Sequence, residues 1–187
     1  MAVSPNGADR INLFALVVYI PDPLAKFLDD LRRDMVPGCV VRAHVTMLPP
    51  RPLSSEPADA IERAREVLSG FAPFEIEPGG IEIFPKTDVI FIGIKKGDRE
   101  LRQIYRALNG GSLAFQEEFS YHPHITLAQG LQPDKVEHLA QVARDRWAEF
   151  RYSRTIPADR ACFVQSTVSC TWLDLAEFRL GAVPLAR

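Results

Sequence analysis

Hydrophobic positions along the chain follow two periods, one typical of strands and one typical of helices. The segment 11–20 has nine apolar residues among ten, which is too short for a membrane span and is typical of a strand buried on both faces. Between residues 24 and 35, apolar residues recur three and four positions apart, with charged residues on the opposite face. That spacing predicts an amphipathic helix, which Pro37-Gly38 should end.

The same two periods predict the remaining elements. We expect helices at residues 56–68, 98–108 and 134–148, and strands at 40–48, 74–77, 81–84, 89–94, 122–128, 160–165 and 171–179. Three residues of Pro49-Pro50-Arg51-Pro52 lack a backbone N–H and should end the strand before them, and Pro78-Gly79-Gly80 should separate two strands. The first ten residues are polar and should be frayed.

The order strand, helix, strand, helix occurs twice, from residue 11 to 68 and again from residue 89 to 148. In both runs the second strand carries a His-x-Thr triplet. This order predicts an α+β fold built from a duplicated unit, with two lobes packed face to face about an approximate two-fold axis. No change in composition marks a domain boundary, so we expect residues 1–187 to form one bilobal domain.

Composition and charge narrow the class of protein. The 187 residues are 47% hydrophobic and 25% charged, which is typical of a globular domain and compatible with a monomer. The formal net charge of −2 argues against binding of long nucleic acid, because phosphate neutralisation needs a basic face. Cys39, Cys162 and Cys170 show no paired spacing and are interpreted as reduced, mostly packed thiols. With no membrane span or signal sequence recognised, we expect a cytoplasmic protein.

The two triplets carry the candidate chemistry. They are His44-Val45-Thr46 and His124-Ile125-Thr126. Residues two apart in a strand point to the same face, so each His shares a face with its Thr, while the residue between them turns toward a core. Arg42 should join the face of His44, and His122 that of His124. If the strands lie beside each other, they form a groove with two imidazoles, two hydroxyls and a guanidinium.

Such a set suits in-line displacement at a phosphodiester. One neutral imidazole takes a proton from the attacking hydroxyl or water, and the other, protonated, gives one to the leaving oxygen. The Thr hydroxyls can donate hydrogen bonds to the non-bridging phosphate oxygens. These groups supply proton transfer and charge stabilisation without a metal or other cofactor.

Two neighbouring residues have more than one interpretation. Arg51 follows the first triplet and could contact a phosphate or base at the cleft mouth, or be a solvated residue that caps the loop. His122 and His124 have a spacing that can chelate a transition metal, but no third ligand occurs at a fixed spacing. His122 is therefore interpreted first as a residue that flanks the strand or orients a neighbour.

The chain resembles the two-histidine (2H) phosphoesterase superfamily, which includes bacterial 2'-5' RNA ligase-like and RNA 2',3'-cyclic phosphodiesterase proteins. The resemblance rests on the two triplets, about 80 residues apart, and on the run Tyr121-His122-Pro123-His124-Ile125-Thr126-Leu127-Ala128. It implies a bilobal α+β fold with two antiparallel-rich sheets facing a central cleft and helices outside. It also implies that His44 and His124 are the acid/base pair and that Thr46 and Thr126 bind the phosphate.

The resemblance implies a metal-independent hydrolase of a 2',3'-cyclic phosphate or a 2'-5' phosphodiester, in an RNA end or a small nucleotide. One departure affects the substrate: the best-known RNA cyclic phosphodiesterases continue their first motif with an apolar-Phe-Leu-Gly run, where this chain has Met47-Leu48-Pro49-Pro50. Two other hypotheses stay open at this point. One is a non-catalytic module that binds a nucleotide or RNA end, and the other is a metal-dependent hydrolase that uses His122 and His124.

Overall fold

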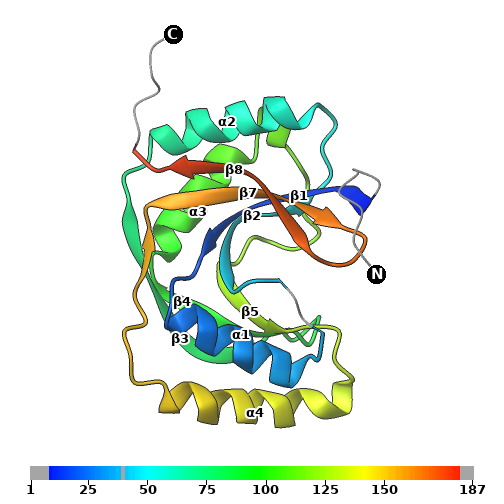
Figure 1. Cartoon of the computed structure of the whole chain (residues 1–187), viewed down its shortest axis with the longest axis vertical. Coiled ribbons are helices and arrows are strands. Elements are labelled where there is room, and N and C mark those ends of the chain that lie inside the picture. Colours follow the sequence, from blue (N-terminus) through cyan, green and yellow to red (C-terminus); the bar gives the residue numbers. More distant parts are fainter. Residues whose placement is uncertain (1–8, 39–40, 182–187) are drawn as a thin grey trace.

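Two four-stranded antiparallel sheets form the centre of the computed structural model, which describes residues 9–38 and 41–181 (Figure 1). The first sheet has the order β2-β1-β7-β8 and consists of β1 (Arg10–Tyr19), β2 (His44–Arg51), β7 (Arg160–Thr167) and β8 (Trp172–Arg179). The second has the order β5-β4-β3-β6 and consists of β3 (Phe74–Ile83), β4 (Ile90–Lys96), β5 (His124–Ala128) and β6 (Ile156–Ala158). The predicted α+β class with two antiparallel sheets is confirmed.

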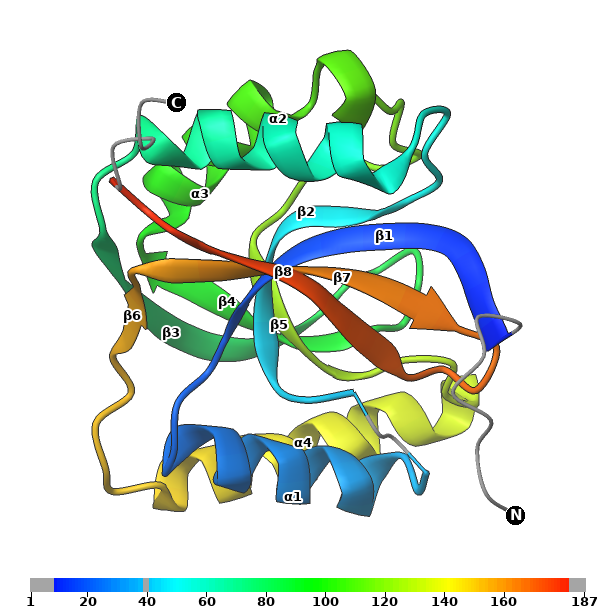
Figure 2. The same ribbon diagram turned by 45° about the horizontal axis from the view of Figure 1, so that its top comes forward.

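Four helices cover the outer faces, and two of them pack against the sheet opposite to the one whose strand they follow. They are α1 (Leu24–Met35), α2 (Pro57–Ser69), α3 (Asp98–Leu108) and α4 (Pro133–Glu149). Helix α1 follows β1 of the first sheet but packs against β5 and α4, and α3 follows β4 of the second sheet but packs against β2 and α2. Figure 2 shows α2 and α3 on one side of the sheets and α1 and α4 on the other.

The central strand β1 is buried on both faces, as its continuous hydrophobic run predicts. Phe14, Leu16 and Val18 belong to a large cluster of buried residues that includes side chains from both sheets and all four helices. Ala15 and Val17 point to the opposite face, where they pack with Cys162 and Val164 of β7. This second, smaller cluster is the floor of the concave side of the sheet.

Two expectations about proline are wrong. Strand β2 continues through Pro49 and Pro50 to Arg51, which pairs with Phe14 of β1. Pro49 and Pro50 lie between the pairs Leu48–Leu16 and Arg51–Phe14, where the register of β2 with β1 shifts, so the irregular pairing accommodates two residues without an N–H. Strand β3 likewise runs from Phe74 to Ile83, and Pro78-Gly79-Gly80 only shifts its register with β4.

Smaller differences concern the ends of the chain and the cysteines. Arg10 belongs to β1, so the expectation of fraying is wrong for this residue, and residues 1–8 lie outside the described residues. Cys162 is buried, whereas Cys170 is exposed, so the expectation of packing fails for Cys170. Cys39 and the predicted strand start at residue 40 lie outside the described residues. Among the described helices, none combines the length and hydrophobicity that a membrane crossing requires.

Candidate active site

The two His-x-Thr triplets open equivalent strands of the two sheets. His44 is the first residue of β2, and His124 is the first residue of β5. In both strands the His and the Thr are partly exposed, and the residue between them is fully buried. The predicted alternation therefore holds, and each imidazole shares a face with a hydroxyl.

The fold brings the two triplets together. Strands β2 and β5 lie next to each other where the sheets meet (Figure 1), and the hydroxyl of Tyr121 donates to the backbone oxygen of Thr46 at 2.6 Å. This hydrogen bond joins the segment that leads into the second triplet to the strand that carries the first.

Both imidazoles are oriented by the same backbone contact. The Nδ1 atom of His44 is 2.7 Å from the carbonyl oxygen of Arg42, and Nδ1 of His124 is 2.6 Å from the carbonyl oxygen of His122. A carbonyl oxygen only accepts, so Nδ1 carries the hydrogen in both rings. The Nε2 atom is left as the free position, which accepts a proton when the ring is neutral and donates one when it is charged.

Aromatic side chains pack against both imidazole rings. The ring of Trp172 is centred 4.5 Å from that of His44, and Phe84 and Phe91 meet His124 edge-on at 5.1 Å and 5.5 Å. Burial lowers the pKa of His44 from 6.5 to about 4, and it also lowers the pKa of His124. In the free protein both imidazoles are therefore neutral at pH 7.

Arg42 and His122 flank the site on its two sides. The Arg42 guanidinium stacks 3.9 Å above the ring of Tyr19 and is 4.0 Å from the carboxylate of Asp174, with 63% of its side chain exposed. Tyr19 is the cross-strand neighbour of His44, so Arg42 lies beside the first motif. His122 is exposed and meets Phe84 edge-on at 5.3 Å, beside the second motif.

Arg51 is not where either interpretation placed it. Its side chain is 0% exposed and donates to the carbonyl oxygens of Pro49 and Leu113, to the Asn109 side chain and to the Glu117 carboxylate. Burial raises the pKa of Glu117. The guanidinium is thus neither solvated nor free for a phosphate. It ties the end of β2 to the loop that leads into the second motif.

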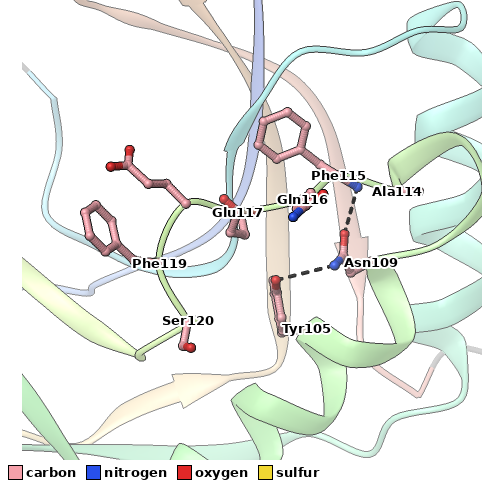
Figure 3. Close-up of a pocket in the computed structure, with 9 residues that line it drawn as sticks. Tyr105, Asn109, Ala114, Phe115, Gln116, Glu117, Phe119 and Ser120 are labelled. Carbon is pink, nitrogen blue, oxygen red and sulfur yellow. Dashed lines mark hydrogen bonds between the residues drawn. The ribbon is translucent and has the colours of Figure 1, made fainter.

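A cavity of about 690 Å³ lies on that loop (Figure 3). It is lined by Tyr105 and Asn109 of α3 and its end, and by residues 114–120 of the loop. None of the predicted site residues lines it. We therefore place the candidate chemistry between the sheets and not in this cavity.

The potential for a metal site is limited in the described part of the chain. Residues 9–38 and 41–181 contain no group of three or more His, Cys, Asp or Glu side chains that could hold a metal ion. His122 and His124 have ring centres 6.4 Å apart and no third ligand joins them there.

Sequence reasoning missed three residues of the site. Tyr121 links the two motifs, Trp172 packs on His44, and Asp174 accepts from the Tyr19 hydroxyl at 2.6 Å. Tyr121 could have been noticed because it begins the run 121–128 that contains the second triplet. Trp172 and Asp174 lie far from both motifs in the sequence, and only the pairing of β8 with β7 brings them to the site.

A model of the 2'-5' RNA ligase superfamily matches residues 20–167, which include both triplets. The chain belongs to this superfamily. The resemblance seen in the sequence is thereby confirmed at the level of the family. Among curated relatives, a predicted phosphoesterase of Bacillus cereus is 27% identical over 144 residues, which cover 76% of this chain and 81% of that protein. A relative in Bacillus anthracis is 28% identical over the same shares of the two chains.

Several solved structures share the fold of this chain at low sequence identity. E. coli LigT in complex with 3'-AMP superposes with a TM-score of 0.62 at 15% identity, over 93% of this chain and 99% of LigT. The protein TT0787 of Thermus thermophilus gives 0.59 at 16% identity, over 90% and 98%. Usb1 of Kluyveromyces marxianus with uridine monophosphate gives 0.53 at 14% identity, over 88% and 97%.

Proposed function

We propose that the protein is a metal-independent phosphoesterase that acts on a 2',3'-cyclic phosphate or a 2'-5' phosphodiester, in an RNA end or a small nucleotide. The observation that carries the proposal is the matched pair of imidazoles. Each has its Nδ1–H bound to a backbone carbonyl, so that Nε2 is the free position in both rings. Membership of the superfamily supports phosphoester chemistry in general.

The proposed reaction on a cyclic phosphate is an in-line displacement. The neutral Nε2 of one His takes a proton from water as the water oxygen bonds to phosphorus. The bond from phosphorus to one ribose oxygen breaks, and the protonated Nε2 of the other His gives its proton to that oxygen. The first imidazole ends charged and the second neutral, and exchange with solvent restores both. Thr46 and Thr126 donate to the non-bridging oxygens, whose charge shifts in the transition state.

The surroundings of the two rings suggest a division of roles. Trp172 packs against His44, whose pKa is about 4. His44 is therefore neutral at pH 7 and is proposed as the base. Burial and the neighbouring His122 lower the pKa of His124 as well, so its role as the acid is proposed for the state with phosphate bound. An anionic phosphate bound between the rings would raise the pKa of both, because a nearby negative charge favours the charged form of His.

The size of the proposed substrate agrees with what solved relatives hold. Structures of E. coli LigT have been determined with 3'-AMP and with ATP, and Usb1 with uridine monophosphate. These proteins share only the fold with this chain, so the nucleotide itself is part of the proposal.

The deciding experiment measures hydrolysis of the four nucleoside 2',3'-cyclic monophosphates and of a short RNA with a 2',3'-cyclic end, all in EDTA. The wild type should turn over at least one of them, and His44→Ala and His124→Ala should each lose about 10²–10⁴ in rate. His138→Ala, which changes an exposed imidazole on α4, is the matched control and should keep full activity.

Three outcomes would contradict the proposal. Unchanged turnover in either His44→Ala or His124→Ala would remove that residue from the chemistry. Loss of wild-type activity in EDTA, with recovery on adding zinc or manganese, would replace the proposed mechanism by a metal-dependent one. Binding of a nucleotide without turnover of any substrate would leave a binding module.

A further inference from the structure

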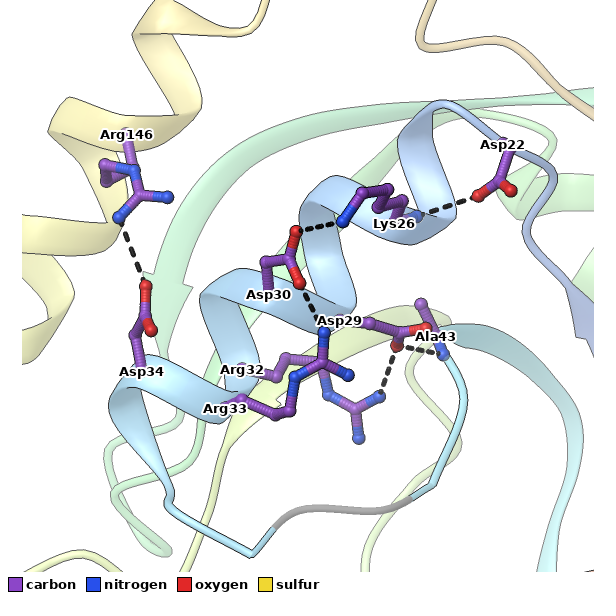
Figure 4. Close-up of polar contacts among 9 residues, drawn as sticks. All are labelled: Asp22, Lys26, Asp29, Asp30, Arg32, Arg33, Asp34, Ala43 and Arg146. Carbon is purple, nitrogen blue, oxygen red and sulfur yellow. Dashed lines mark hydrogen bonds and ion pairs between the residues drawn. The ribbon is translucent and has the colours of Figure 1, made fainter.

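Helix α1 holds the segment that leads into the first motif. Nη1 of Arg32 donates to the carbonyl oxygen of Val41 at 2.6 Å, and the Asp29 carboxylate accepts from the backbone N–H of Ala43 at 2.7 Å. The Arg32 and Asp29 side chains are also 3.6 Å apart, and Figure 4 shows both beside Ala43. The carbonyl held by Arg32 belongs to the residue three positions before His44.

Helix α3 makes the same contact in the other half of the molecule. Nη1 of Arg102 donates to the carbonyl oxygen of Tyr121 at 2.7 Å, and its Nε donates to Asp98 at 2.8 Å. Tyr121 is three positions before His124. The two helices have equivalent places in the duplicated unit, because each connects the first strand of its half to the strand that carries the motif.

These contacts are made one residue before the hydrogen bonds that orient the imidazoles. In each half the Arg binds the carbonyl three residues before the His, and the His Nδ1–H binds the carbonyl two residues before it. The two carbonyls belong to consecutive residues. Fixing the first therefore restricts the rotation of the peptide that presents the second.

We infer that Arg32 and Arg102 are equivalent positioning residues, each of which fixes the tautomer and direction of the imidazole in its own half. The inference rests on the proposed function for its consequence in catalysis. The duplicated contact supports it, since an incidental hydrogen bond from Arg to a carbonyl oxygen has no reason to recur at the same offset from both motifs. Arg32 is also buried, with 7% of its side chain exposed, which is unusual for a group that only adds solubility.

The decisive measurement is the nitrogen NMR spectrum of the histidine rings, which distinguishes Nδ1–H from Nε2–H tautomers and needs no substrate. In Arg102→Met, His124 should change from the Nδ1–H tautomer to a mixture, while His44 should keep its spectrum. In Arg32→Met the effects should be reversed. The matched controls are Arg106→Met and Arg33→Met, which remove exposed arginines from the same two helices and should change neither ring.

Turnover gives a second readout if the wild type is active. Each Met variant should lower kcat by about 10- to 100-fold, the range expected for a displaced catalytic group, with KM within about twofold. Arg102→Lys should recover part of kcat, because its ammonium can still donate to the Tyr121 carbonyl. Arg102 is partly exposed, so its variants decide the question if the Arg32 variants do not fold.

The outcomes separate this inference from the proposed function. A tautomer change confined to the half that carries the substitution supports the positioning role, even if no substrate is found. Unchanged spectra in Arg102→Met, or equal changes in both histidines, overturn it. An unchanged kcat in Arg102→Met overturns its catalytic consequence, whereas an inactive wild type with the expected spectra counts only against the proposed function.

Discussion

At the scale of single residues, His44 makes stability depend on pH. Its pKa is about 4 in the folded protein, below the ordinary 6.5. The unfolded chain therefore binds a proton more readily between these values, so stability is complete above about pH 6.5 and falls as the pH drops toward 4. His44→Asn should reduce this loss by about 1–3 kcal/mol, a range discounted for partial exposure.

Urea unfolding at pH 7 and pH 4.5 checks this prediction. The control is His138→Asn, which removes an exposed imidazole and should leave the acid sensitivity of the wild type unchanged. Equal losses of unfolding free energy in the wild type and in His44→Asn would show that the imidazole is not desolvated in the way that the Trp172 contact suggests.

Arg51 is predicted to act on stability and not on the chemistry. Arg51→Met leaves the partly buried Glu117 carboxylate and the Leu113 carbonyl without their buried donor and should lower the free energy of unfolding by about 3–5 kcal/mol. The kcat per folded molecule should stay close to that of the wild type, since the guanidinium contacts only protein groups. Chemical denaturation combined with kinetics at low temperature measures both quantities. A large rise in KM with unchanged stability would return Arg51 to the substrate site.

At the scale of elements, the junction of β2 and β5 depends on Tyr121. Its hydroxyl donates to Thr46, and its ring stacks on Tyr105 with centres 4.3 Å apart. Tyr121→Phe keeps the stack and leaves the Thr46 carbonyl without its donor, which should cost about 1–3 kcal/mol of stability. Because the two motifs are then joined less firmly, kcat should also fall by about tenfold.

Tyr105→Phe is the matched control for this link. The Tyr105 hydroxyl accepts a long 3.4 Å contact from Asn109, and within residues 9–38 and 41–181 no hydrogen bond joins it to either triplet. That variant should keep both stability and kcat near the wild-type values. If both phenylalanine variants behave alike, the stacked rings and not the hydroxyl hold the strands together.

The sequence predicts elements well where periodicity is strong and poorly where pairing decides. The helix expected at 98–108 has those bounds in the structure, because its apolar positions recur over three turns. The bounds of β2 and β3 were missed, since a strand continues through proline where its pairing register shifts, and the sequence does not show where that happens. The three-residue β6 has no periodic signal at all.

The site shows the same division. The faces of His44 and His124 follow from a period of two within one strand and were predicted. The contacts of Arg51, Trp172 and Arg102 join segments that are distant in sequence, and no local pattern encodes them. A buried Arg and a phosphate-binding Arg are alike in sequence, because only the packing around Asn109 and Glu117 distinguishes them.

At the scale of the whole molecule, helices α1 and α3 connect the two halves. Helix α1 packs against β5 of the second sheet while its Arg32 holds the approach to the first motif, and α3 does the reverse with Arg102. Each motif is therefore positioned by a helix that rests on the opposite sheet. The geometry between the imidazoles is a property of the complete fold and not of either half.

The charge of the whole chain sets the expected dependence on salt. With a formal net charge of −2, the protein should bind only the few phosphates near its site. Arg42 is the exposed cation beside the first motif that could contact one of them. For a short RNA with a cyclic end, a plot of log kcat/KM against log salt should then have a slope of about −1 to −2, because each neutralised phosphate of a single strand contributes about 0.7. The slope should be the same for a ten-nucleotide and for a twenty-nucleotide RNA with a cyclic end. Arg42→Gln should make the slope less steep for both RNAs, by the contribution of about one phosphate. A slope that steepens with RNA length would mean that more of the protein surface contacts the RNA backbone than the net charge indicates.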